Sequence, residues 1–132
     1  MAKKKKPTAA ELAILRVLWA RGPSTVREVA VAMGRDEAYT TVLKLMQIMT
    51  EKGLISRDAA TRAHVYSAVS SEDHTQRQLV ADLLDRVFDG SASRLLMQAL
   101  AARQASPEEL RAIRRLIATA QSARGSKKKE ES

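Results

Sequence analysis

Four polar side chains recur at helical spacing between residues 40 and 51: Thr40, Lys44, Gln47 and Glu51. This spacing predicts one exposed helix face, because such positions lie on the same side of a helix. Hydroxyl and amide groups on that face can hydrogen-bond the edges of base pairs in the major groove of DNA. The alternative is an ordinary solvated helix face with no partner.

The helix that must position these side chains has an apolar opposite face, formed by Val42, Leu45, Met46 and Met49. We expect it to span residues 37–52, with Asp36 as its N-cap and Gly53 as its stop. A β-hairpin should follow, since β-favouring residues at 54–57 and 63–69 flank a polar turn. Arg57 and Arg62 border that turn and could hold phosphates. Double-stranded DNA is therefore the first partner to test.

The Ser/Thr-x-x-Glu capping pattern occurs three times, starting at Thr8, Thr25 and Ser106, and predicts three helix N-termini. Helices are expected at 9–20 and 26–33, directly before the helix described above. The sequence therefore predicts a mainly α protein in which residues 7–69 form a winged helix-turn-helix.

From residue 70 the pattern changes to helices alone, expected at 72–89, 92–103 and 107–122. Their apolar faces contain Leu79, Leu83, Leu84, Val87, Phe88, Leu95, Leu96, Leu110, Ile113, Leu116 and Ile117. So short a segment buries too little apolar surface to be stable by itself. Packing on the winged domain would cover these faces, but a second copy would also present two recognition helices to two DNA half-sites. We therefore predict that residues 70–123 form the dimerisation region of a homodimer.

The net charge of +8 is concentrated at the two ends of the chain. The lysine runs at 3–6 and 127–129, offset by two glutamates, leave only +3 for residues 7–126. We expect residues 1–6 and 124–132 to be disordered charged tails. They could attract phosphates without regard to sequence, or only aid solubility.

The residue inventory argues against an enzyme and against a metal or cofactor site. The chain has no cysteine, and His64 and His74 lack zinc-site spacing. It has no Ser/His/Asp set and no Gly-rich phosphate loop with its lysine. Because it also lacks a signal sequence and any apolar run of about eighteen residues, we expect a cytoplasmic protein with no membrane insertion.

Several segments resemble the BlaI/MecI penicillinase-repressor family: AELAILRVLWARGPSTVREV, AYTTVLKLMQIMTEKGLI, RAHVY and SPEEL. The similarity covers residues 8–118 and is most specific at 19–28 and 38–41. It implies a homodimeric transcriptional repressor that occupies a dyad-symmetric operator.

The resemblance also implies which residues contact the operator, namely Thr40, Thr41, Lys44 and Gln47 from the recognition helix and Arg62 and His64 from the wing. Tyr39 could donate its hydroxyl to a phosphate or pack its ring at the helix start. Several relatives have arginine near position 47 or 48, where this chain has Gln47 and Ile48. Since glutamine can pair with adenine and arginine favours guanine, the operator preferred by those relatives is not assumed for this chain.

A candidate regulatory partner implied by the resemblance is an inducer-activated membrane metallopeptidase. In the founding members the protease cuts between Asn and Phe, whereas the aligned pair here is Gln98-Ala99. A copper-responsive branch uses C-terminal cysteines, which this chain lacks. The cleavage pair of the founding members is therefore absent at this position, and copper control through C-terminal cysteines is excluded.

The residues alone are also compatible with two other functional classes of protein. A winged-helix protein-interaction module would show little salt-dependent affinity for DNA. A sequence-neutral architectural DNA protein, which the lysine tails would suit, would bind all duplexes alike.

Overall fold

The computed structural model describes residues 6–60 and 62–131, with side chains up to residue 125. The chain divides into two compact units, the first ending at Leu83 and the second beginning at Leu84. The expected N-terminal tail lies outside the described residues except for Lys6. Among the described residues, no helix is both long enough and apolar enough to cross a membrane.

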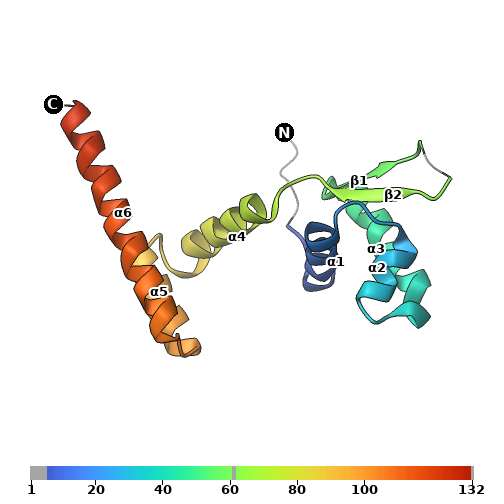
Figure 1. Cartoon of the computed structure of the whole chain (residues 1–132), viewed down its shortest axis with the longest axis horizontal. Coiled ribbons are helices and arrows are strands. Elements are labelled where there is room, and N and C mark those ends of the chain that lie inside the picture. Colours follow the sequence, from blue (N-terminus) through green and yellow to red (C-terminus); the bar gives the residue numbers. More distant parts are fainter. Residues whose placement is uncertain (1–5, 61, 132) are drawn as a thin grey trace. The chain divides into compact units, whose positions relative to one another are not determined.

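The first unit is a winged helix, and its elements follow in the order that the sequence predicts (Figure 1). They are α1 (Ala9–Arg21), α2 (Val26–Ala32), a 3-10 turn η1 (Asp36–Ala38), α3 (Tyr39–Lys52), β1 (Ile55–Asp58), β2 (Val65–Ala68) and the first turns of α4 (Glu72–Val87). The predicted fold class is thus confirmed: a mainly helical chain with an antiparallel hairpin after its first three helices.

Two of the predicted capping boxes are complete. Thr8 Oγ1 accepts a hydrogen bond from Glu11 N–H at 3.2 Å, and Glu11 Oε1 accepts one from Thr8 N–H at 2.8 Å. Thr25 and Glu28 form the same pair of bonds at 3.1 and 2.9 Å. These bonds satisfy N–H groups that a helix start would otherwise leave without partners.

The start of the recognition helix differs from the prediction. The chain makes the turn η1 first, and α3 begins at Tyr39 without a side-chain cap. Asp36 does not cap α3, because its carboxylate accepts a hydrogen bond from Arg27 Nη1 at 2.9 Å. The end agrees with expectation, since Gly53 has a left-handed φ of 80° and closes α3.

One hydrophobic core joins the three helices and the hairpin. Its buried side chains are Ile14, Leu15, Leu18, Val26, Val29, Ala30, Val42, Met46, Met49, Ile55 and Tyr66. Leu12 and Trp19 are half-buried at its edge, and the indole Nε1–H of Trp19 donates to Ser70 O at 2.9 Å. The core thereby fixes which face of α3 is left to solvent.

The wing is held by more than its own two strands. β1 and β2 pair antiparallel, with Arg57 opposite Tyr66. Ser24, from the α1–α2 connection, bridges to Tyr66 by two backbone hydrogen bonds of 2.8 and 3.0 Å. A single residue therefore acts as a third strand, which no local β-pattern in the sequence indicated.

The second unit contains the end of α4, α5 (Ala92–Ala102) and α6 (Pro107–Glu131). No side chain described between Leu84 and Gly125 is buried. The division lies inside α4, because the first turns of α4 belong to the winged unit, where Thr75 is buried. The functional boundary expected after residue 69 stays a prediction.

Helix α6 runs past residue 122, where its end was expected, through the segment 124–131 that was expected to be a disordered tail. A single glycine, Gly125, does not stop a helix, and the Lys and Glu residues that follow it are good helix formers.

Candidate nucleic-acid interface

The solvent-facing side of α3 brings together all four of the predicted helix contacts. Thr40, Thr41, Lys44 and Gln47 are exposed, whereas Val42, Met46 and Met49 on the opposite side are buried. We call these four residues the exposed α3 face. Two hydroxyls, one ammonium and one amide can donate or accept hydrogen bonds at base edges and phosphates.

A cleft of about 370 Å³ separates the start of α3 from the wing. Tyr39, Arg62 and His64 line it, so the structure brings the predicted wing contacts to the N-terminal end of the recognition helix. Arg62 and His64 are both exposed. Thr61 lies outside the described residues.

Arg27 also lines this cleft, and sequence reasoning missed it. Its guanidinium lies over the ring of Tyr39, 4.5 Å from the centroid, and it pairs with Asp36. Both contacts hold a cation at the mouth of the cleft. No periodic pattern connects residue 27 with residue 39, so only the fold could place them together.

A second, open hollow of about 850 Å³ lies between the C-terminal half of α3 and β1. It is lined by Gln47, Glu51 and Arg57, among others. The Glu51 carboxylate can accept a hydrogen bond from cytosine N4 but would repel a phosphate. The exposed side of α3 is therefore cationic at its middle and anionic at its end.

Lys52 is close in sequence to this surface, but its ammonium is paired with a buried carboxylate. Its Nζ lies 2.7 and 3.0 Å from the two carboxylate oxygens of Glu11, whose side chain is only 2% exposed. Burial alone would raise the pKa of Glu11, but the hydrogen bond and charge of Lys52 and the Thr8 N–H outweigh it, so the pKa is lowered. The capping pattern predicted the position of Glu11 but not this ion pair.

The family model described as penicillinase repressor matches residues 7–119. The chain belongs to the penicillinase repressor family. The match includes the whole winged unit and continues into α6. Family membership therefore agrees with the resemblance already visible in the sequence.

Curated relatives of this penicillinase-repressor chain include the proteins called "Transcriptional regulator BlaI" from two strains of Mycobacterium tuberculosis, CDC 1551 / Oshkosh and H37Rv. Each is 33% identical over 120 residues, which span 89% of this chain and 86% of the relative.

The residues predicted for dimerisation are placed in different surroundings. Leu79 lines a cavity of the first unit together with Leu15 and Leu54. The other predicted residues range from half-buried to exposed, with Val87 at 64% and Leu116 at 68% exposure. The second unit thus leaves much apolar surface uncovered within one chain.

Proposed function

We propose that the chain is a transcriptional repressor that binds double-stranded DNA through the exposed α3 face and the wing. The observation that carries this proposal is that Arg62 and His64 share a cleft with Tyr39 at the start of α3, the helix whose exposed face bears the four polar side chains. Thr40, Lys44 and Gln47 would face base edges, and the arginines would contact phosphates on either side. Family membership supports the same function.

We also propose that two copies bind a dyad-symmetric operator in the cytoplasm. The support is the uncovered apolar surface of the second unit, which includes Val87, Leu116 and Ile117. Large hydrophobic side chains that gather at the surface of a soluble protein often mark a protein interface. A twofold dimer would present two copies of α3 to two half-sites.

Fluorescence anisotropy with the chain's own upstream DNA and with a shuffled duplex, each at two salt concentrations, tests the proposal. We expect the upstream duplex to bind about a thousandfold more tightly. Equal affinities would instead indicate a sequence-neutral architectural protein, and salt-insensitive weak binding would indicate a protein-interaction module. Removing Lys3–Lys6 should weaken binding to both duplexes by the same factor and reduce the salt dependence of that binding.

An inducer-activated membrane metallopeptidase is the proposed regulatory partner. Gln98 and Ala99 are exposed and lie within α5. Cleavage there would require this helix to unwind locally. Mass spectrometry of the chain after incubation with a peptidase encoded beside its gene tests this partner, and an intact chain would exclude cleavage by that peptidase.

A further inference from the structure

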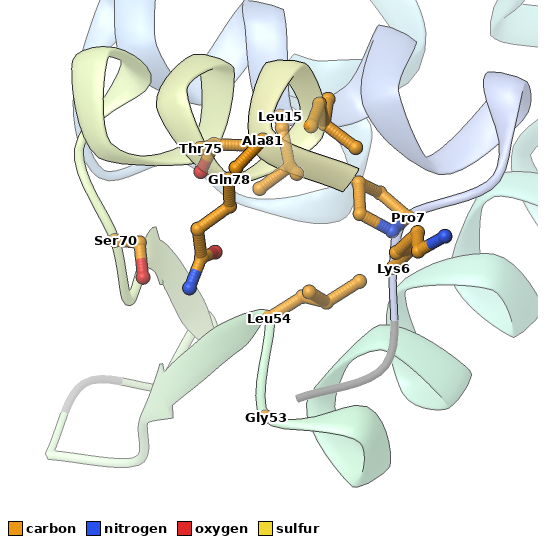
Figure 2. Close-up of a pocket in the computed structure, with 10 residues that line it drawn as sticks. Lys6, Pro7, Leu15, Gly53, Leu54, Ser70, Thr75, Gln78 and Ala81 are labelled. Carbon is orange, nitrogen blue, oxygen red and sulfur yellow. The ribbon is translucent and has the colours of Figure 1, made fainter. Parts of the chain in front are cut away.

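A cavity of about 310 Å³ lies inside the first unit, away from the exposed α3 face. It is lined by Lys6, Pro7, Leu15, Gly53, Leu54, Ser70, Thr75, Gln78, Leu79 and Ala81. Figure 2 shows Gln78 extending from α4 into the space that Leu54 bounds from the other side. The volume is about twice that of a protein cavity known to hold benzene, and it reaches the range of small-ligand pockets.

The walls of this cavity are apolar except for a few polar groups. Leu15, Leu54 and Leu79 supply most of the apolar lining. Two polar side chains of α4 also line it: Thr75, which is only 7% exposed, and the exposed Gln78. A hydroxyl and an amide can each donate and accept hydrogen bonds, so a largely apolar site with these two groups suits a small molecule.

Charge at the rim argues for an uncharged occupant. The ammonium of Lys6 is paired with the carboxylate of Asp82. Lys6 is the only charged side chain among the described residues that line the cavity, so an ion entering this apolar space would be an unpaired charge, which is costly.

We propose that this cavity binds a small neutral molecule with an apolar ring and one amide or hydroxyl group, and that its occupancy changes the affinity for DNA. Gly53 and Leu54 directly follow α3, and Ser70 immediately precedes the segment that leads into α4. An occupant would therefore touch the end of the recognition helix and the start of α4 together. The regulatory half of this inference rests on the proposed function.

The fluorescence of Trp19 can report on binding in this cavity. Trp19 is the only tryptophan, and its indole N–H bonds the carbonyl of Ser70 in the cavity wall. Benzamide, benzoate and benzylamine have nearly the same shape and differ in charge. Titrating each into the full chain while recording Trp19 emission should give a saturable change with benzamide, at a dissociation constant on the order of 1 mM. The two charged compounds should bind at least tenfold more weakly.

Gln78→Leu and Gln76→Leu form a matched pair of variants. Both change an exposed glutamine of α4, but only Gln78 lines the cavity. Gln78→Leu should weaken benzamide binding roughly two- to tenfold, the effect of one lost hydrogen bond, and Gln76→Leu should leave it unchanged. No saturable response to benzamide, equal responses to all three compounds, or equal effects of the two variants would overturn the binding site.

The regulatory half is measured with upstream duplex DNA. Saturating benzamide should change the dissociation constant of the protein–DNA complex at least threefold in the unmodified chain and less in Gln78→Leu. A saturable Trp19 response with unchanged DNA affinity would overturn the regulation and leave the site intact. Failure of the ligand-free chain to bind the duplex would count against the proposed function alone, because the Trp19 titration needs no DNA.

Discussion

The two lysines of α3 have different roles because their surroundings differ. Lys44 is exposed and forms no ion pair with any described residue, whereas Lys52 is bonded to the buried carboxylate of Glu11. A cation that is already paired and partly desolvated contributes little to binding a phosphate. At the residue scale, the available positive charge of α3 is therefore that of Lys44.

Lys44→Ala and Gln47→Ala should each weaken binding to the upstream duplex by about 1–3 kcal/mol, because each removes a contact with a base or phosphate. Gln47→Ala should also relax preference at one base pair, which anisotropy with single-base variants of the duplex would detect. Gln76→Ala, on α4, is the control. An unchanged base preference in Gln47→Ala would make Gln47 a bystander.

Arg27→Ala should weaken binding to upstream and shuffled duplexes by the same factor, about three- to tenfold, and reduce the salt slope by about one. The reason is that a phosphate contact carries no sequence information. Arg27 can make such a contact because its pair with Asp36 is exposed to solvent, unlike the pair of Lys52 with the buried Glu11. Arg16→Ala removes the same charge from an exposed position on α1. If the two variants lost equal affinity, Arg27 would act only through the overall charge.

Glu11→Gln should lower the free energy of unfolding at pH 7 by about 1–3 kcal/mol, since it leaves Lys52 without its partner. The pKa of Glu11 is lowered in the fold. Its stabilisation is therefore fully present above the unfolded carboxyl pKa of about 4.3 and is lost as the pH falls through the lower folded value. Urea unfolding at pH 7, 5 and 3 should show the variant and the unmodified chain converging as the pH falls.

Glu28→Gln is the matched control for this change. Glu28 occupies the same capping-box position in α2, but its side chain is 48% exposed and pairs with Arg21 at the surface. Its substitution should lower the free energy of unfolding at pH 7 by less than Glu11→Gln does. Equal losses in the two variants would assign the effect to capping rather than to the buried ion pair.

At the scale of elements, α3 ends where the wing begins, and Gly53 makes that junction. Gly53→Ala should lower the free energy of unfolding by about 1–2 kcal/mol, because its φ of 80° is unfavourable for a residue with a Cβ. No atom lies within 4 Å of the position of that Cβ, so the cost is conformational and not steric. Chemical unfolding measures it.

Gly125→Ala is the opposite case, because Gly125 lies within α6 and has an ordinary helical backbone. Alanine there should leave stability unchanged or raise it slightly. Destabilisation by both substitutions would contradict a specific role for the left-handed conformation at Gly53.

Local sequence signals predicted the elements well, and contacts between elements poorly. The capping boxes at Thr8 and Thr25 and the stop at Gly53 depend on neighbouring residues, so the sequence alone locates them. Asp36 was misassigned as a cap because its partner, Arg27, comes from another helix. The exposed α3 face followed from periodicity, whereas the place of Arg27 in the cleft depends on how α2 packs on α3.

At the scale of the whole molecule, the proposed dimer depends on the second unit, which would bring two winged units together. Leu84→Asp should yield monomers and lose most of the affinity for the upstream duplex, because a buried unpaired carboxylate would destabilise the proposed interface. Sedimentation velocity measures the mass. Ser93→Asp adds the same charge to an exposed residue of α5 and should stay dimeric. An unchanged mass for Leu84→Asp would refute its place in the interface.

The bridge between Ser24 and Tyr66 also has a consequence for aggregation. A two-stranded hairpin has open edges that can pair with strands of other molecules. Ser24 occupies both backbone hydrogen-bonding groups of Tyr66 on the outer edge of β2. Strand addition from a neighbouring molecule would have to displace a residue that is only 1% exposed. The same bridge that holds the wing beside α3 thus protects that edge of β2 from self-association.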